Sequence, residues 1–268
     1  MGKIIAVANQ KGGVGKTTTA INLAAAVAMA GSRVLLVDVD PQSNLTSGVG
    51  MRERVAPEHS IYTALTATDG EPDLLAALVR PTGIDGLALI PADRNLTGAE
   101  LELVGLLARE QRLRRMLRPL AVQYDYVFID CPPSLGLLTL NALVAADSVL
   151  IPLHCEYFAL EGLAELVSTL RRVRTALNPA LDIEGVLLTM YEDRTNLGQQ
   201  VAREVRQFFQ EKTFDTVIPR NVRLGEAPSH GMPVLLYDAK SRGSEAYVRL
   251  AREFIDRNGQ RETQHSTR

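Results

Sequence analysis

Short runs of consecutive apolar residues alternate with longer segments of helical periodicity along almost the whole chain. The runs IIAVA, VLLV, YVFI, VLIPL and VLLTM are apolar throughout rather than alternately apolar and polar. Strands have this pattern when helices cover both faces of a parallel sheet. The pattern predicts strands at Lys3–Ala8, Arg33–Asp38, Leu87–Pro91, Tyr126–Asp130, Ser148–Leu153, Gly185–Met190, Thr216–Pro219 and Val234–Tyr237.

The segments between these strands carry apolar residues at helical spacing. They predict helices at 16–30, 97–121, 136–146, 159–176, 196–211 and 244–257. This alternation is typical of a doubly wound α/β fold, so we expect a mostly parallel sheet with helices on both faces. The least regular segment, 48–85, is expected to form short helices at the sheet edge. No linker divides the chain, which predicts one domain over 1–256 and a disordered polar tail over 257–268.

Composition excludes several classes of protein. The 29 basic and 31 acidic residues give a net charge of -2, so a DNA-binding surface would have to be a local patch. Two cysteines, Cys131 and Cys155, are too few for a disulfide framework, which favours a reducing compartment. The longest uncharged stretch, Thr17–Ser32, is shorter than a membrane span. Lys11 and Lys16 interrupt any signal-peptide core, so we expect a soluble cytoplasmic protein.

The sequence QKGGVGKTTT, residues 10–19, follows the first predicted strand and opens the first predicted helix. Glycines let successive backbone N–H groups turn toward phosphate oxygens, and a helix N-terminus adds partial positive charge. In such a P-loop, Lys16 would contact the β- and γ-phosphates and the Thr17 hydroxyl would bind Mg²⁺. The alternative, a glycine-rich turn with an incidental lysine, leaves the strand–loop–helix context unexplained.

The loop departs from the common pattern G-x-x-x-x-G-K-[ST] in two places. Gln10 stands at the first position, and Lys11 is an additional lysine inside the loop. A dinucleotide-binding motif does not fit, because the third glycine counted from Gly13 and Gly15 would fall at Thr18. The loop therefore favours a nucleoside triphosphate over NAD.

Three aspartates stand at the ends of predicted strands. Asp38 and Asp40 lie in DVDPQSN, at the carboxyl end of a strand, where ligands bind in open α/β sheets. Asp130 ends the apolar run YVFI, as a Walker B aspartate does. Such carboxylates would hold Mg²⁺ and position a water molecule. A strand-end aspartate is as often a turn or helix cap, and the neighbouring P-loop favours the functional interpretation.

With these motifs the chain resembles the ParA-type partition ATPases, and among them the chromosomal Soj-like branch. KGGVGKTT matches the deviant Walker A motif of that family, with its signature lysine at Lys11. DVDPQSN matches switch I, and FIDCPPSLGLLTLNAL matches Walker B and switch II. CEYFALEGL, VLLTMYEDRTNLG, TVIPRNVRLGEAPSHG and LYDAKSRGSEAY also resemble the family, so the resemblance covers residues 2–256.

The resemblance implies an ATPase that binds ATP and Mg²⁺ and forms a face-to-face homodimer around two ATP molecules. It implies non-specific binding to double-stranded DNA and stimulation by a ParB-type centromere-binding partner. It also implies a role in chromosome or plasmid segregation, on the nucleoid in the cytoplasm and without membrane attachment.

The resemblance also implies roles for single residues. Lys11 would reach across the dimer to the partner's phosphates, as an arginine finger does, while Lys16 contacts phosphates within the protomer and Asp40 positions the attacking water. Mg²⁺ would be held by Thr17, Asp38 and Asp130. Gly12 would lie where two P-loops meet. The ATP-binding residues would be Lys11, Gly12, Gly13, Val14, Gly15, Lys16, Thr17, Thr18 at the α-phosphate, and Met190, Pro219 and Asn221 around the adenine. For the last three, packing alone is the alternative.

DNA contact is implied by the resemblance and not by composition. The family's DNA-contacting arginines correspond to Arg194 and Arg223, with Lys240 and Arg242 as neighbours. Taken alone, an isolated surface arginine is usually a solvated side chain. A second basic cluster lies on one predicted helix, and we interpret it as a solvated face, with DNA or partner contact as the alternative: Arg109, Arg112, Arg114, Arg115 and Arg118.

Two other functions stay as alternatives. P-loop iron proteins bridge a [4Fe–4S] cluster with two cysteines per subunit, but neither Cys131 nor Cys155 falls where those proteins carry ligands. A MinD-like membrane-positioning ATPase would need a C-terminal amphipathic helix with a basic polar face. Here the polar face has mixed charge, so we expect the helix to dock on the core through Ala246, Tyr247, Leu250, Ala251, Phe254 and Ile255.

Overall fold

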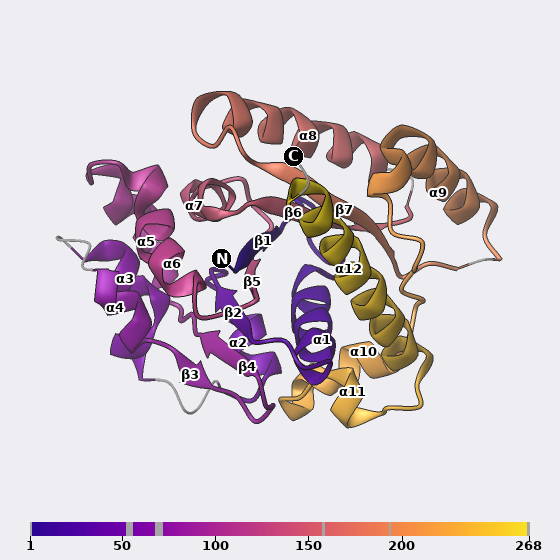
Figure 1. The fold of residues 1–268 in the computed structure, drawn as a ribbon, viewed down its shortest axis with the longest axis horizontal. Helices are drawn as coiled ribbons and strands as arrows, with labels where there is room; N and C mark the ends of the chain where they lie inside the picture. The colour runs from indigo at the N-terminus through magenta and orange to yellow at the C-terminus, as the bar shows by residue number, and fades with distance from the viewer. Residues whose placement is uncertain (1, 52–55, 68–71, 157–158, 193, 267–268) are drawn as a thin grey trace.

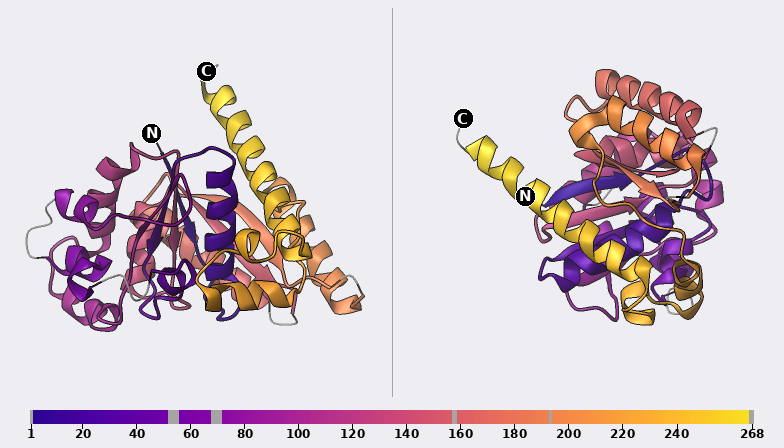
Figure 2. Two further views of the ribbon diagram at one scale, coloured as in Figure 1. Left: turned by 90° about the horizontal axis from the view of Figure 1, so that it is seen from below. Right: turned by 90° about the vertical axis from the view of Figure 1, so that its right-hand side faces the viewer.

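A computed structural model describes residues 2–51, 56–67, 72–156, 159–192 and 194–266. Within them a central sheet runs through the molecule between two layers of helices (Figure 1). Two further views show the helices on either side of the sheet and the long C-terminal helix crossing one face (Figure 2).

The sheet is mostly parallel. Its described strands are β1 (Lys3–Val7), β2 (Val34–Asp38), β3 (Arg80–Pro81), β4 (Leu87–Ile90), β5 (Tyr126–Asp130), β6 (Ser148–His154) and β7 (Asp182–Thr189). They lie in the order β3-β4-β2-β5-β1-β6-β7, and only the short β3 pairs antiparallel, with β4. The doubly wound α/β fold expected from the sequence is confirmed.

Each face of the sheet has its own hydrophobic core. Along β1, Ile4 and Ala6 belong to one core while Ile5 and Val7 belong to the other, as alternation in a strand requires. One core includes residues of α3 (Ile61–Thr66), α4 (Pro72–Ala77), α5 (Leu96–Val104), α6 (Arg112–Ala121), α7 (Leu137–Ala145), α8 (Ala159–Ala176) and α9 (Asn196–Phe209). The other includes residues of α1 (Lys16–Met29), α2 (Asn44–Gly48), α10 (Val222–Glu226), α11 (Val234–Tyr237) and α12 (Arg242–Ser266).

Short 3₁₀ turns complete the described elements: η2 (Pro57–His59), η3 (Arg109–Gln111), η4 (Gln210–Lys212) and η5 (Ala227–His230). In the irregular region 48–85, the short helices expected at the sheet edge are present as η2, α3 and α4. The parts of that region at 52–55 and 68–71 lie outside the described residues.

Several predicted elements differ in the structure. Val234–Tyr237 forms the helix α11 and not a strand, because four apolar residues do not distinguish the two periodicities. Thr216–Pro219 runs beside the end of β7 but makes only an isolated bridge, Tyr191 to Pro219. The predicted helix 97–121 is divided into α5 and α6, with Gly105 at the C-cap of α5 and Ala108 in a left-handed conformation.

The C-terminal helix α12 docks on the core. The apolar stripe that a membrane anchor would use is buried, and Tyr247, Leu250 and Phe254 are each at most 1% exposed. The docked position expected from the sequence is therefore confirmed. The helix continues to Ser266, past the expected end of the domain, and disorder of the tail stays a prediction. In the described ranges no helix is both long and apolar enough to cross a bilayer.

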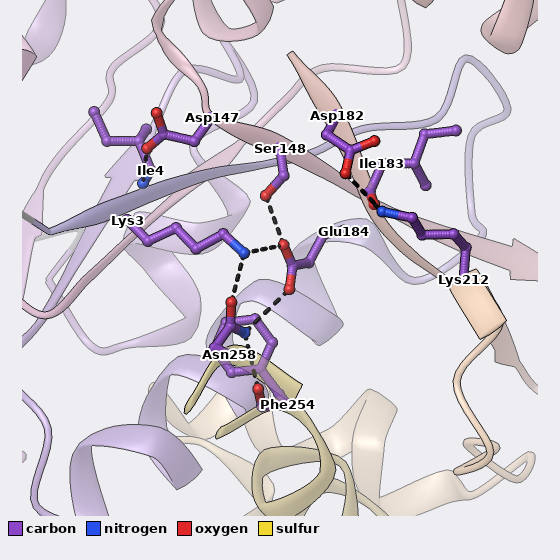
Figure 3. A network of polar contacts seen from close by, with 10 residues as sticks. All are labelled: Lys3, Ile4, Asp147, Ser148, Asp182, Ile183, Glu184, Lys212, Phe254 and Asn258. Carbon is purple, nitrogen blue, oxygen red and sulfur yellow. Dashed lines mark hydrogen bonds and ion pairs between the residues drawn. The ribbon is translucent and has the colours of Figure 1, made fainter. Parts of the chain in front are cut away.

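A buried polar cluster ties α12 to the sheet at the edge where β1, β6 and β7 begin (Figure 3). Lys3 donates to Glu184 and to Asn258, each at 2.5 Å, and the Ser148 hydroxyl donates to Glu184 at 2.7 Å. Asn258, on α12, also donates to Glu184 at 3.1 Å. The Glu184 side chain is fully buried, so its charge depends on these partners.

Removing Lys3 should therefore destabilise the fold. We expect Lys3→Met to cost about 2 kcal/mol of unfolding free energy, below the usual cost of breaking a buried pair because Lys3 is a quarter exposed. Adding Glu184→Gln should recover part of the loss. Urea unfolding measures both, with Lys212→Met, which removes a more exposed pair with Asp182, as the control. Equal losses for Lys3→Met and Lys212→Met would contradict the assignment.

Candidate nucleotide-binding site

The loop between β1 and α1 has the backbone of a phosphate-binding loop. Gly13 and Gly15 have φ values of 72° and 85°, a left-handed conformation that glycine adopts without strain. The helix α1 begins at Lys16, whose Nζ donates to the Lys11 carbonyl across the loop at 3.2 Å. The backbone therefore curls around the Lys16 side chain.

Two side chains that the sequence analysis did not single out hold this loop on the sheet. The Asn9 side-chain amide donates to the Pro152 carbonyl at 2.8 Å, and the side-chain oxygen of Asn9 accepts from the Lys11 N–H at 3.0 Å. The Thr189 hydroxyl, at the end of β7, donates to the Val14 carbonyl at 2.8 Å. Asn9 had a signal in the sequence, as a polar residue directly after an apolar strand, whereas Thr189 had none.

A cavity of about 750 Å³ lies over the loop, within the size range of small-molecule sites. It brings together most of the residues expected to bind ATP: Gly12, Gly13, Gly15, Lys16, Thr17, Thr18, Met190, Pro219 and Asn221. Asp40 also lines the cavity, whereas Val14, although part of the loop, is buried and does not line it. Further lining residues not expected from sequence include Thr189, Ile218, Arg220, Glu226 and Tyr247.

The expected adenine residues line one wall of this cavity. Met190 has a φ of 48°, unusual outside glycine, and directly follows β7. Asn221 is the N-cap of α10, where its side chain accepts from the Arg223 N–H at 2.9 Å. Asn221 therefore has a structural role in addition to its place at the cavity.

The strand-end aspartates lie side by side beneath the cavity. Parallel pairing of β2 with β5 sets Asp38 opposite Asp130. Asp38 is fully buried and accepts from the Thr46 N–H at 2.9 Å, the Thr46 hydroxyl at 2.7 Å and the Asp40 N–H at 3.1 Å. Burial raises the Asp38 pKa to about 6, against the lowering effect of these hydrogen bonds.

Asp130 is buried with neither carboxyl oxygen in a hydrogen bond of good geometry. Burial and the nearby Asp38 raise its pKa well above the ordinary value, although the Thr17 hydroxyl lies close enough to lower it. Burial also lowers the pKa of Lys16, and Asp130 and Asp40 oppose that shift. An unpartnered buried carboxylate is costly, so this site fits a cation.

The oxygen donors of Thr17, Asp38 and Asp130 suit Mg²⁺, which is usually held by one or two carboxylates together with phosphates and water. Among the described residues no group of three His, Cys, Asp or Glu side chains forms a metal site by itself. A cation here would thus be completed by a bound phosphate.

The additional lysine of the loop, Lys11, does not line the cavity, although it was expected among the ATP-binding residues. The Lys11 ammonium forms an ion pair with Glu156 at 2.6 Å, and His154 contacts the other oxygen of that carboxylate at 2.8 Å. The hydrogen bond from Lys11 lowers the Glu156 pKa. Both side chains are more than a third exposed, so breaking this pair costs little.

The expected DNA-contacting residues are exposed, and three of them lie on or next to helices that pack together. Arg223 on α10, Lys240 just before α12 and Arg242 at its start belong to elements in mutual contact. Arg194 lies on the segment between β7 and α9. Arg223 is paired within the protomer, with Glu226 at 2.7 Å and Asp238 at 3.3 Å.

The second basic cluster is in part structural, which corrects its interpretation as a solvated face. Arg112 is buried and donates to the carbonyls of Leu65, at 2.5 Å, and Ala67. Arg118 pairs with Asp147 at 2.6 Å, and Arg109 pairs with Glu110 at 3.0 Å. Helix C-termini leave unsatisfied carbonyls, and Arg112 satisfies two near the end of α3.

The cysteines do not suit a cluster shared between subunits. Cys131 is fully buried, and burial raises its thiol pKa. Burial also raises the pKa of Cys155 to about 11. Iron–sulfur clusters need thiolate ligands, and a buried thiol is not available to a second subunit, so this alternative is not supported.

Comparisons with known proteins identify the family of the chain. The family AAA_31, described as an AAA domain, matches residues 2–183. The sporulation initiation inhibitor protein Soj of Bacillus subtilis is 57% identical over 253 residues, covering 94% of this chain and 98% of Soj. The chromosome partitioning protein ParA of Myxococcus xanthus is 55% identical over 258 residues, covering 96% of this chain and 89% of that protein.

Among solved structures, cobyrinic acid a,c-diamide synthase from Mycobacterium smegmatis, with bound ADP and magnesium, superposes with a TM-score of 0.79. It is 38% identical, and the match covers 94% of this chain and 93% of that one. Identity above half over nearly the whole length, together with the P-loop and its strand-end aspartates, decides the assignment. The chain belongs to the ParA/Soj family of chromosome-partitioning ATPases.

Proposed function

We propose that this protein is an ATP-dependent DNA-partitioning ATPase whose ATP-bound dimer binds DNA without sequence preference. Hydrolysis, stimulated by a ParB-type partner, would release it from DNA and so drive segregation on the nucleoid. The observation that carries the proposal is a cavity lined by P-loop residues and Asp40, next to the paired buried aspartates Asp38 and Asp130, in a chain 57% identical to Soj. The ADP and magnesium bound by the mycobacterial structure support ATP and Mg²⁺ as ligands.

Within a protomer, the phosphate loop and the strand-end aspartates would supply the groups for phosphoryl transfer. The backbone N–H groups of the loop and the Lys16 ammonium would hold the phosphates, and Thr17 with Asp38 and Asp130 would hold Mg²⁺. When bound, Mg²⁺ would neutralise charge on the phosphates. The Asp40 carboxylate lies at the cavity, where it would accept a hydrogen bond from water and orient it toward the γ-phosphate.

The dimer would supply the remaining cation. Lys11 is held by Glu156 at the protomer surface, in a pair that it would have to leave to reach a partner's phosphates. In the dimer, Lys11 would exchange its exposed ion pair with Glu156 for contacts with the more highly charged triphosphate of the partner. This exchange favours the dimer only when a triphosphate is bound.

DNA binding would depend on that dimer because the protomer has little general attraction for phosphate. The chain has a net charge of -2, and Arg223 is balanced by two carboxylates. Two juxtaposed protomers would double the local concentration of basic side chains. The attraction would be electrostatic and would fall steeply with salt.

The proposal as a whole is tested by the ATPase rate of the full chain, measured with and without DNA and with and without its ParB-type partner. We expect slow basal hydrolysis that rises when both are present. A rate indifferent to both would contradict a partition function while leaving the nucleotide site intact.

Gly12→Val should leave the protomer folded and able to bind nucleotide but block the dimer. A Cβ added at Gly12 has its nearest neighbour, the Pro133 Cβ, at 4.0 Å, so the protomer has room for it. Light scattering with ATP reads out the dimer, and Lys16→Ala, which should weaken nucleotide binding itself, is the contrasting variant. A normal ATP-dependent dimer from Gly12→Val would show that the loops do not meet.

Asp40→Ala should bind ATP, dimerise and remain on DNA, but hydrolyse ATP at least about a hundredfold more slowly. Asp40 also accepts from the Gln42 N–H at 2.9 Å, so its loss is expected to cost about 1 kcal/mol of stability as well. Asp40→Asn separates the two roles, because the amide oxygen keeps that hydrogen bond but not the charge. If Asp40→Asn hydrolysed ATP at the normal rate, Asp40 would have only the structural role in the turn.

Arg223→Ala and Arg194→Ala should weaken DNA binding to a similar degree for unrelated sequences, while ATP-dependent dimerisation stays normal. Arg172→Ala on α8 is a matched control, since Arg172 is exposed on a helix that packs on the face of the sheet opposite to the helix of Arg223. DNA affinity is measured at several salt concentrations. Unchanged affinity in both variants at matched salt would place the DNA surface elsewhere.

A further inference from the structure

The hydroxyl of Thr46 lies where three segments of the chain meet beneath the nucleotide cavity. Thr46 is on α2 and is 1% exposed. Its Oγ1 lies 2.7 Å from Asp38 Oδ2, at the end of β2, and 3.0 Å from the backbone nitrogen of Ala92, just beyond β4. Its own N–H also donates to Asp38 Oδ2, at 2.9 Å.

These contacts fix the direction of each hydrogen bond. The Ala92 N–H can only donate, so Thr46 Oγ1 accepts a hydrogen bond from it. The Thr46 hydroxyl therefore donates its own hydrogen bond to Asp38. Thr46 thereby supplies two of the three donors that the Asp38 carboxylate has in this structure. A hydroxyl with both functions engaged has no freedom to rotate, and it holds the carboxylate plane with it.

The third donor connects this arrangement to Asp40. Asp38 Oδ1 accepts from the Asp40 N–H at 3.1 Å, and Asp40 in turn accepts from the Gln42 N–H. The orientation of the Asp38 carboxylate thus sets the backbone from which the Asp40 side chain reaches the cavity. A chain of three hydrogen bonds thus connects Ala92 to Thr46, Thr46 to Asp38 and Asp38 to Asp40.

The charge environment makes this support necessary. Asp38 faces Asp130 across the β2–β5 pairing, and both are fully buried. Two adjacent carboxylates repel each other, and the charge of Asp130 is offset by the nearby Thr17 hydroxyl and Lys16 ammonium and not by well-formed hydrogen bonds. Without the hydroxyl of Thr46, Asp38 would lose one of its donors and the restraint on its rotation.

We infer that Thr46 is a positioning residue for hydrolysis, acting through Asp38 to hold the Mg²⁺-side carboxylate and the Asp40 backbone in place. The inference rests on the proposed ATPase function and adds a residue that contacts neither the nucleotide nor the attacking water. Its effect is expected on turnover and on the response to Mg²⁺, and only weakly on ATP affinity, because Thr46 is separated from the phosphates by Asp38.

The test compares Thr46→Val, which keeps the shape and removes the hydroxyl, with Thr46→Ser, which keeps the hydroxyl and removes a methyl group. We expect kcat of Thr46→Val to fall about tenfold or more with KM for ATP within about twofold. The Mg²⁺ concentration for half-maximal rate should rise. Thr46→Ser should restore both values to within about threefold of the parent.

A second readout does not depend on hydrolysis. The Tm of each variant is measured with ADP and Mg²⁺ and with ADP and EDTA, and the difference is the Mg²⁺-dependent part of nucleotide stabilisation. This difference should shrink in Thr46→Val and be retained in Thr46→Ser. If Thr46→Val does not fold, Thr46→Cys replaces it, because a thiol of similar size is a weak donor.

Two results would overturn the inference. Parent-like kcat and Mg²⁺ response in folded Thr46→Val would show that the hydroxyl positions nothing needed for turnover. Equal losses in Thr46→Val and Thr46→Ser would assign the effect to the packing of this buried side chain as a whole and not to its hydroxyl. A parent protein that hydrolyses no ATP would instead contradict the proposed function, and the Tm comparison with ADP would still decide the role of Thr46.

Discussion

Parallel pairing of three neighbouring strands is the constraint on which the site depends. Because β2, β5 and β1 are adjacent and run in the same direction, Asp38, Asp130 and the phosphate-binding loop emerge at one edge of the sheet. Strand pairing brings together residues that are 92 positions apart between β2 and β5 and 123 positions apart between β1 and β5. A slip of one residue in the β2–β5 register would move Asp38 away from Asp130 and turn it to the other face.

The same edge of the sheet contains two buried carboxylates, and these differ in how their charge is offset by neighbouring groups. Asp38 is supported by Thr46 and Asp40, whereas Asp130 is left for Lys16 and a cation to neutralise. Lys11 is instead partly exposed and held by a weak surface pair. In the proposed mechanism, the charged groups that act within a protomer are therefore the buried ones, and Lys11, assigned to the partner, is the one whose ion pair costs little to break.

The sequence predicted the fold and the centre of the site where its signals are local. Continuous apolar strands and the strand–loop–helix context of Lys16 needed no distant contact to be interpreted. The helical state of Val234–Tyr237 and the burial of Arg112 are decided by tertiary packing, which periodicity does not contain. Thr46 and Thr189 were missed for the same reason, since their partners Asp38 and Val14 are identified only by the fold.

Asn221 has a consequence for the thermodynamics of the proposed cycle. Its side chain caps α10, the helix that carries Arg223, and the same residue lines the nucleotide cavity. A ligand that shifts this residue acts on both surfaces at once. Binding linkage is reciprocal, so in the proposed cycle any factor by which nucleotide raised the affinity for DNA would also be the factor by which DNA raised the affinity for nucleotide. DNA of the nucleoid would then slow the loss of nucleotide from the protein as well as bind the protein.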